Sequence, residues 1–340
     1  MIAPRLAVAL GAAALSAPLT AGQPGPWTEA VVSVTDIAAA TRLFRVAGGW
    51  RTTHRGAVSR EELRYWALPD TVSARFERLC APGADTGCLR FVRFRGATQR
   101  PVRRALRAWD SGGIYSIMVR SDNVEALFDT ALSLGWWAES APVRFSFGTS
   151  DLRNVVLTGP HGINLAVYER VSPPITAFRV GRISQAFNSM RMVRDKARAR
   201  AFYETTLGFS VLFDSNAEPA EPAPSNFGIP LDHTPRIRRS AAALQPAPGE
   251  TGRVEVMQIE GFGGQDASAH ASPPNLGILS VRYPVADIDS YREAVKERGG
   301  ETAYEAMAVP IGGIGIVNIF SVRDPDGNIT EFYDLAKGRR

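Results

Sequence analysis

The stretch Ser321–Asp334, SVRDPDGNITEFYD, joins a tight turn directly to a strand that carries a carboxylate. Asp324–Gly327 is typical of a turn, because proline fixes its own φ and glycine accepts a positive φ. Side chains alternate along the strand that follows, so Ile329, Glu331 and Tyr333 face one side and the residues between them face the other. Glu331 therefore points either to water or into a cavity that uses an acid.

The elements around this stretch recur along the chain. A strand ending in aspartate, an amphipathic helix and a glycine–aromatic stop occur in Val31–Trp50 and again in Met190–Phe209. A strand, an Asp-containing turn, a helix and a glycine occur in Ile114–Trp136 and again in Ile278–Gly300. Each run continues into further strands, so the sequence predicts an α+β protein with four βαβββ units. A chain of 340 residues is long enough for two domains.

Several segments of these units resemble the vicinal oxygen chelate superfamily, which includes glyoxalase I, methylmalonyl-CoA epimerase, type I extradiol dioxygenases and bleomycin- or fosfomycin-resistance proteins. The segments are AFYETTLGF (Ala201–Phe209), RDPDGNITEF (Arg323–Phe332), VTDIAAATRLF (Val34–Phe44) and GPHGINLAVYE (Gly159–Glu169). The resemblance implies glyoxalase-like domains in which a pair of βαβββ units curls into a U-shaped half-barrel around a cavity. It covers nearly the whole chain but leaves the reaction open, because one fold hosts many chemistries.

We expect consecutive units to pair, which divides the chain into two domains. The first glyoxalase-like domain spans residues 27–170 and the second spans residues 180–336, with a linker at 171–179 that contains Pro173 and Pro174. Under this division the candidate active site lies in the second domain.

The resemblance also implies where a site lies, because metal-binding members take their ligands from the first and last strands of each unit. In the second domain these positions hold Asn188, Glu255, Ser280 and Glu331. We therefore expect Glu331 and its pseudo-symmetric counterpart Glu255 to face each other across one cavity as catalytic carboxylates. Tyr333, on the same face as Glu331, is a candidate proton donor.

This ligand set contains no histidine, so the iron of a dioxygenase or the zinc of a glyoxalase fits poorly. An oxygen set suits a divalent cation such as Mg or Mn, with Glu255, Glu331 and Asn188 as candidate ligands. Alternatively, an inward Arg282 neutralises one glutamate and replaces the metal with a buried ion pair. In both cases the pocket is polar with adaptable apolar walls, and the predicted substrate-binding residues are Asn188, Met190, Met192, Met257, Ser280 and Arg282.

The first domain departs further from the family pattern. Its corresponding positions hold Glu29, Arg90, Tyr115 and Ala166. These four residues do not make up a set of metal ligands. Glu29 and Arg90 have opposite charges, which allows them to pair. We expect this domain to support the structure, or to bind a ligand without chemistry.

The N-terminus and the cysteines indicate export. Residues 1–22 contain one arginine, a short apolar run and small residues suited to cleavage, as in a secretory signal peptide. Cys80 and Cys88 flank a loop of turn residues, and in an oxidising compartment we expect them to form a disulfide. The expected location is periplasmic or secreted, with no transmembrane segment and, despite the net charge of +5, no nucleic-acid partner.

Two functions remain open from the sequence. The first is an exported glyoxalase- or epimerase-type lyase or isomerase that acts on a small carbonyl-containing or aromatic metabolite, with a glutamate as the base. The second is a non-catalytic protein of the resistance type that sequesters a small molecule.

Overall fold

The computed structural model describes residues 22–105, 107–217 and 221–336. Of the predicted signal peptide, only Gly22 lies within this range. The described chain contains the four expected βαβββ units in sequence order, numbered here units 1 to 4, with additional short helices. No helix in these three segments is both long and apolar enough to cross a membrane.

Units 1 and 2 make up the first half of the chain. Unit 1 comprises β1 (Glu29–Ser33), α1 (Ile37–Val46), β2 (Arg51–Ala57), α2 (Arg60–Tyr65), β3 (Ser73–Cys80) and β4 (Cys88–Arg95). Unit 2 comprises β5 (Ile114–Arg120), α3 (Val124–Ser133), β6 (Trp137–Ala138), β7 (Val143–Phe147), β8 (Ser150–Thr158), η1 (Pro160–Gly162) and β9 (Asn164–Ser172). The helix α2 is an insertion that the sequence analysis did not predict.

Units 3 and 4 follow after Pro173 and Pro174. Unit 3 comprises β10 (Asn188–Met192), α4 (Lys196–Ala201), η2 (Phe202–Thr206), β11 (Ser210–Ala217), η3 (Thr234–Arg236), β12 (Arg238–Gln245), β13 (Arg253–Glu260) and η4 (Ser268–His270). Unit 4 comprises β14 (Gly277–Pro284), α5 (Ile288–Glu297), β15 (Thr302–Ile311), β16 (Gly315–Arg323) and β17 (Ile329–Leu335).

A single capping contact explains why each unit turns from strand to helix at the same place. The residue before each major helix has an extended backbone, and its side chain accepts a hydrogen bond from the backbone N–H three residues later. Such caps satisfy a backbone donor that the helix leaves free. The capping residues are Asp36, Asn123, Asp195 and Asp287.

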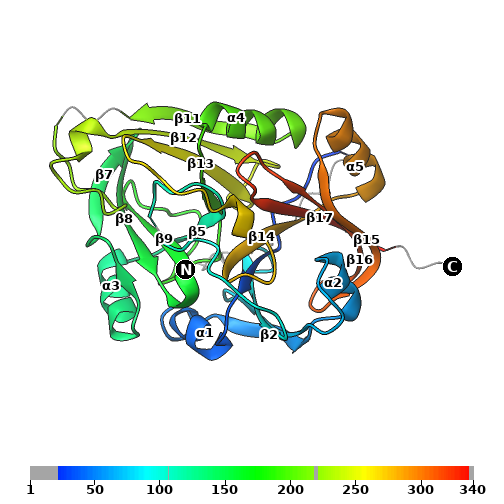
Figure 1. Cartoon of the computed structure of the whole chain (residues 1–340). Helices are drawn as coiled ribbons and strands as arrows, with labels where there is room; N and C mark the ends of the chain where they lie inside the picture. Colours follow the sequence, from blue (N-terminus) through cyan, green and yellow to red (C-terminus); the bar gives the residue numbers. More distant parts are fainter. Residues whose placement is uncertain (1–21, 106, 218–220, 337–340) are drawn as a thin grey trace, which may run out of the picture.

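The strands form two curled sheets, but the pairing of units differs from our expectation. Units 1 and 4 form the first half-barrel, with strand order β15-β16-β17-β14-β1-β4-β3-β2. Units 2 and 3 form the second half-barrel, with β11-β12-β13-β10-β5-β9-β8-β6, and β7 pairs with β8 at its edge (Figure 1). The prediction that consecutive units pair is therefore wrong, and a boundary at residues 171–179 does not separate the sheets.

A buried charge pair lies across the junction of units 1 and 4. Glu29 of β1 lies opposite Arg282 of β14 in the antiparallel pair that joins the two units. Arg282 is in turn aligned with Glu331 in the parallel pair of β14 and β17. Unit 1 thus brings a negative charge to the one position of unit 4 that holds a buried cation.

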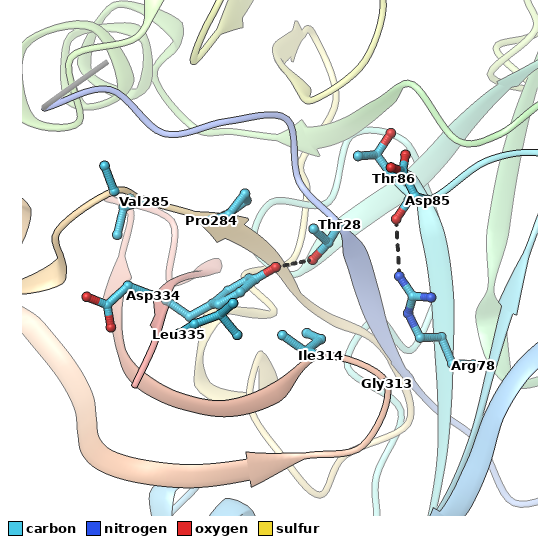
Figure 2. Close-up of a pocket in the computed structure, with 12 residues that line it drawn as sticks. Thr28, Arg78, Asp85, Thr86, Pro284, Val285, Gly313, Ile314, Asp334 and Leu335 are labelled. Atoms are coloured by element: carbon cyan, nitrogen blue, oxygen red, sulfur yellow. Dashed lines mark hydrogen bonds between the residues drawn. The ribbon is translucent and has the colours of Figure 1, made fainter. Parts of the chain in front are cut away.

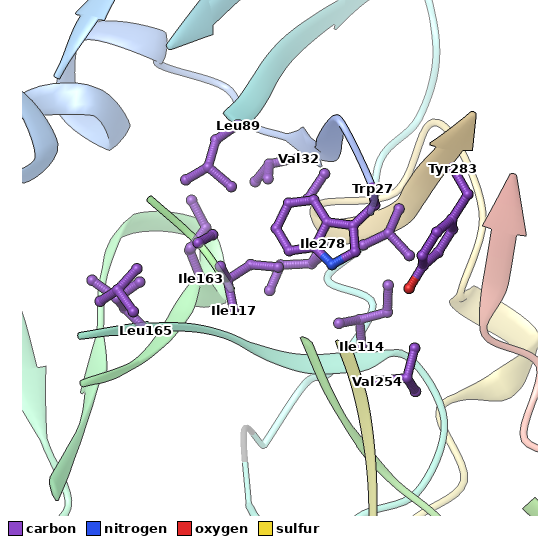
Figure 3. Packing of buried hydrophobic residues seen from close by; sticks show 14 of the residues in the cluster. Trp27, Val32, Leu89, Ile114, Ile117, Ile163, Leu165, Val254, Ile278 and Tyr283 are labelled. Carbon is purple, nitrogen blue, oxygen red and sulfur yellow. The ribbon is translucent and has the colours of Figure 1, made fainter. Parts of the chain in front are cut away.

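The largest apolar core lies between the convex faces of the two sheets. Trp27 is fully buried at its centre, with side chains from both half-barrels around it (Figure 3). The residues drawn around it include Val32, Leu89, Ile278 and Tyr283 from the first half-barrel and Ile114, Ile117 and Val254 from the second. The concave face of each half-barrel holds a separate, smaller cluster, and these faces are where functional side chains gather.

The predicted disulfide is confirmed. Cys80 at the end of β3 and Cys88 at the start of β4 are bonded and buried. Gly87 precedes Cys88 with φ +63, and a Cβ there would lie 2.0 Å from the carbonyl oxygen of Ala186. Only glycine fits this close approach between units 1 and 3.

Candidate functional site

The four predicted ligand positions of the second domain are divided between the two half-barrels. Ser280 and Glu331 lie in the first half-barrel, on β14 and β17, whereas Asn188 and Glu255 lie in the second, on β10 and β13. The prediction that Glu255 and Glu331 face each other across one cavity is therefore wrong. Its physical cause is the pairing of unit 4 with unit 1 instead of unit 3.

Arg282 occupies the centre of the first half-barrel and pairs with three carboxylates. Its Nε donates to Oε2 of Glu331 at 2.7 Å, its Nη1 to Oε1 of Glu29 at 2.9 Å, and its Nη2 to Oε1 of Glu62 at 2.9 Å. All of these side chains are buried. Arg282 therefore points inward and forms a buried ion pair with Glu331, as one of the two alternatives expected.

Two further arginines complete this cluster. Arg90 donates from Nη2 to Glu62 at 2.9 Å, and its Nε lies 4.0 Å from Glu29, so the expected pairing of Glu29 and Arg90 is present. Arg78 donates from Nε to Glu29 at 2.9 Å. Three guanidinium groups therefore balance three carboxylates in the charge cluster, defined as Glu29, Glu62, Arg78, Arg90, Arg282 and Glu331.

The charge cluster holds the carboxylate of Glu29 ionised. Burial alone would raise the pKa of Glu29, but the charges of Arg90, Arg282 and Arg78 outweigh burial and hold that pKa below its usual value. Glu331 accepts additional hydrogen bonds from Trp66 Nε1 at 3.1 Å and Ser280 Oγ at 2.9 Å. Both oxygens of Glu331 thus accept hydrogen bonds from other side chains of the protein.

The remaining predicted residue of this half-barrel, Tyr333, lies at the edge of a cavity. Its hydroxyl donates a hydrogen bond to Oγ1 of Thr28 at 3.1 Å, and burial raises its pKa to about 12. Tyr333 belongs to the opposite sheet from Glu255. It is therefore not a proton donor beside that carboxylate.

The second half-barrel brings the other predicted residues together. Met190 on β10 is aligned with Glu255 on β13, in the same register as Val31 and Arg90 in the first half-barrel. Asn188 takes the place of Glu29. Asn188 lies opposite Met118 in the antiparallel pair of β10 and β5, as Glu29 lies opposite Arg282 in the antiparallel pair of β1 and β14. Within the second half-barrel the counterparts of Arg282 and Glu331 are the apolar residues Met118 and Ala166.

Glu255 consequently has no cationic partner among the residues that the structure describes. Its side chain is buried, with 8% of the residue exposed, and its one hydrogen bond comes from Nδ2 of Asn188 at 3.3 Å. Burial raises the pKa of Glu255 to about 7, and the amide of Asn188 offsets this only in part. Near neutral pH this carboxyl group can therefore both accept and donate a proton.

The wall around Glu255 is apolar and adaptable. Met190 and Met192 belong to the buried cluster on this concave face, and Met257 packs against it. The predicted set of Asn188, Met190, Met192, Met257 and Glu255 is thus placed on one face of one sheet. The cluster also contains three aromatic side chains that line a small-molecule site well, Tyr115, Phe187 and Phe227, with Tyr168 packed beside them.

The predicted metal set does not form. Glu331 lies in the other sheet, which leaves Glu255 and Asn188 as an incomplete ligand pair. Across residues 22–105, 107–217 and 221–336, no group of three or more histidine, cysteine, aspartate or glutamate side chains is arranged to hold a metal ion. Glu255 and Asn188 supply oxygen ligands from two side chains at most, fewer than the three that we expected.

The comparisons with known proteins agree with the fold. The family model described as the Glyoxalase/Bleomycin resistance protein/Dioxygenase superfamily matches residues 182–332. These residues belong to that superfamily. No curated protein sequence matches the chain.

Solved structures extend the superfamily's fold, the vicinal oxygen chelate fold, over the rest of the chain. Glyoxalase I from Zea mays is 17% identical, with 91% of this chain and 92% of that chain covered and a TM-score of 0.59. A putative dioxygenase from Bacillus subtilis is 10% identical, with 94% and 87% covered and a TM-score of 0.57. At these identities the likeness shows a shared fold and does not bear on the reaction.

Sequence reasoning missed two members of the charge cluster, Glu62 and Arg78, and also missed Trp66, which donates a hydrogen bond to it. Glu62 and Trp66 come from the inserted helix α2 and its C-cap, and Arg78 comes from β3. Ser59 and Glu62 follow the Ser-x-x-Glu pattern of a capped helix start, and Ser59 Oγ does accept a hydrogen bond from the N–H of Glu62. That local pattern gives no sign that the carboxylate of Glu62 turns inward to Arg90 and Arg282.

Proposed function

We propose that this protein binds a small carbonyl-containing or aromatic molecule in its second half-barrel, where Glu255 acts as an acid–base group in proton abstraction, isomerisation or lyase chemistry. The observation that carries the proposal is the contrast between the half-barrels. Glu29, Glu62 and Glu331 are each paired with arginine, whereas Glu255 is buried with one amide as its partner. A buried carboxyl group without a compensating charge is costly, and such groups are concentrated at functional sites.

The proposed chemistry follows from the protonation of Glu255. Above its pKa of about 7 the carboxylate takes a proton from a carbon next to a carbonyl group, the C–H bond breaks, and the electron pair moves to the carbonyl oxygen. The protonated Glu255 then returns a proton to the same carbon while the electron pair moves back and the C=O bond re-forms, so the hydrogen is exchanged, or the centre is inverted if the other face is protonated, without a redox change. Asn188 holds Glu255 in place through its 3.3 Å hydrogen bond.

The side chains around Glu255 indicate the class of substrate. Three methionines and the aromatic groups of Tyr115, Phe187 and Phe227 favour a molecule with an apolar or aromatic body over a highly charged one. The charge cluster of the first half-barrel takes no part, because its members are used in pairing with one another.

Non-catalytic binding is the second candidate function. The methionines Met190, Met192 and Met257 favour it, because flexible thioether side chains adapt to ligands that differ in shape. We also propose that the protein is exported, which is supported by the Cys80–Cys88 disulfide and by the composition of residues 1–22.

The experiment measures exchange of the hydrogen next to a carbonyl for deuterium in D₂O, followed by proton NMR. Pyruvate, phenylpyruvate, hydroxyacetone and acetoacetate form the probe set. We expect the wild-type protein to accelerate exchange for at least one probe, with a rate that rises as pH increases through about 7. Glu255→Gln should abolish the acceleration, because the amide cannot accept the proton.

The matched control is Glu260→Gln, which removes an exposed carboxylate from the same strand. It should keep the wild-type rate. Exchange at the buffer rate for every probe, or full activity of Glu255→Gln, would contradict the enzymatic proposal. Tight binding of a probe without exchange would instead support the second candidate function.

A further inference from the structure

A cavity of about 580 Å³ opens on the first half-barrel, away from Glu255 (Figure 2). It lies between the end of β17, the turn between β15 and β16, and the loop that the disulfide closes. Its volume is within the range of roughly 300–1,000 Å³ that is usual for small-molecule sites. The proposed function makes no use of this cavity.

One wall of the cavity is apolar. Val285, Ile314 and Leu335 line it, and Leu335 is among the most exposed large apolar side chains of the described chain. Figure 2 shows Val285 and Ile314 on the same side of the cavity as Leu335, with Arg78 on the other side. This wall can receive an aliphatic group.

The opposite wall carries a buried guanidinium group with an unused donor. Arg78, 7% exposed, donates from Nε to Glu29, from Nη1 to Thr53 Oγ1 and Cys80 Sγ, and from Nη2 to the backbone oxygen of Asp85. A guanidinium has five N–H groups, so one N–H on Nη2 has no partner among the described residues. Its planar geometry suits a carboxylate oxygen.

An exposed acidic residue, Asp85, lies beside Arg78 at the same cavity. Asp85 lines the cavity, and its carboxylate makes no ion pair or hydrogen bond within the described chain. Asp334 also lines the cavity, but its oxygens accept from the N–H of Ile288 and from Nδ2 of Asn318. Asp85 is therefore the acid that is free to meet a positive group.

We propose that this cavity binds a small zwitterion with an apolar side chain, that is, a free aliphatic amino acid. Its carboxylate meets the unused N–H of Arg78, its ammonium group meets Asp85, and its side chain rests on Val285, Ile314 and Leu335. A simple anion would approach Asp85 and Asp334, and a simple cation would approach Arg78. Only a ligand with both charges satisfies Arg78 and Asp85 together.

The experiment titrates the full-length protein with L-leucine, L-leucinamide and N-acetyl-L-leucine by isothermal calorimetry. The amide lacks the carboxylate and the acetylated form lacks the ammonium group, while all three share the side chain. We expect leucine to bind at least tenfold more tightly than either derivative. Equal binding of all three, or no binding of leucine, would overturn the proposal.

The variant Asp85→Asn tests the contact with the ligand's ammonium group separately from the contact of its carboxylate with Arg78. Because Asp85 has no side-chain partner to lose, we expect the variant to fold normally and to bind leucine and N-acetyl-L-leucine within threefold of each other. Asp129→Asn, which changes an exposed carboxylate on α3, should keep the wild-type preference. An unchanged preference in Asp85→Asn would also overturn the proposal, and neither result bears on deuterium exchange at Glu255, which lies in the other sheet.

Discussion

Replacing Glu255 with glutamine should make the protein more stable at pH 8 and leave its stability nearly unchanged at pH 4.5. Burial raises the pKa of Glu255 from 4.5 to about 7 in the folded protein. The folded state therefore holds this proton more tightly than the unfolded state does. The stability that the protonated group contributes is fully present below about pH 4.5 and is lost as pH rises to about 7.

The magnitude follows from the size of this change. Each pH unit between the two pKa values corresponds to 1.36 kcal/mol, so the charged form of Glu255 costs roughly 3 kcal/mol of unfolding free energy. Glutamine has nearly the same shape and never ionises, so the variant avoids this cost. At pH 8 the variant should exceed the wild type by up to about 3 kcal/mol, and at pH 4.5 the two should agree to within about 0.5 kcal/mol.

Urea denaturation of both proteins at pH 4.5, 6 and 8 measures this difference, because the titration of all other groups cancels between them. Glu260→Gln, an exposed carboxylate on β13, should show no such dependence on pH. If the difference between Glu255→Gln and the wild type is the same at pH 4.5 and pH 8, Glu255 does not titrate near pH 7. A partner for its charge would then have to exist, and the acid–base role would lose its basis.

Three further measurements test the rest of the structure. Arg282→Ala should lower the unfolding free energy by on the order of 3–5 kcal/mol in urea denaturation, because it leaves three buried carboxylates without their shared cation, whereas exposed Arg198→Ala should change it by less than about 0.5 kcal/mol. The double variant Cys80→Ser and Cys88→Ser should lower it by roughly 2–3 kcal/mol, and an unchanged midpoint would mean that the loop is already held in the unfolded chain. A chain ending at residue 179 should show no cooperative thermal transition by circular dichroism, since β1 then lacks β14.

The sequence predicted those features of the fold that depend on residues close together in the chain, such as helix starts and the two faces of a strand. The aspartates at 36, 195 and 287 marked the helix starts because a cap depends on residues only three positions apart. Alternation along β17 grouped Glu331 with Ile329 and Tyr333 on one face, and the family resemblance then turned Glu331 inward, where it is buried. The same resemblance selected Asn188 and Glu255, which are joined by a hydrogen bond.

The partners of these residues could not be predicted in the same way. Each of the four units has the same pattern, so the pattern does not say which two units share a sheet. The choice is made by contacts such as Glu29 with Arg282, which are distant in the sequence and depend on the whole fold. The role of Glu62 could not be predicted for a related reason. It lies on the short α-helix α2, and no α-helix occupies that place in the described residues of the other three units, so the repeat offers no comparison.

The union of the first and last units also sets an order in which this chain can fold. Glu29 and Arg282 are 253 positions apart, and ribosomes add about 5–20 residues each second, so β1 waits roughly 13–50 s for its neighbour during synthesis. The second half-barrel needs nothing beyond Glu260 and can form first. During the wait, unit 1 presents an unpaired strand edge, which is a hazard for aggregation. The inward charges of Glu29 and Arg90 disfavour pairing of that edge with a strand of another chain. The same residues therefore stabilise the complete sheet and reduce aggregation before it is complete.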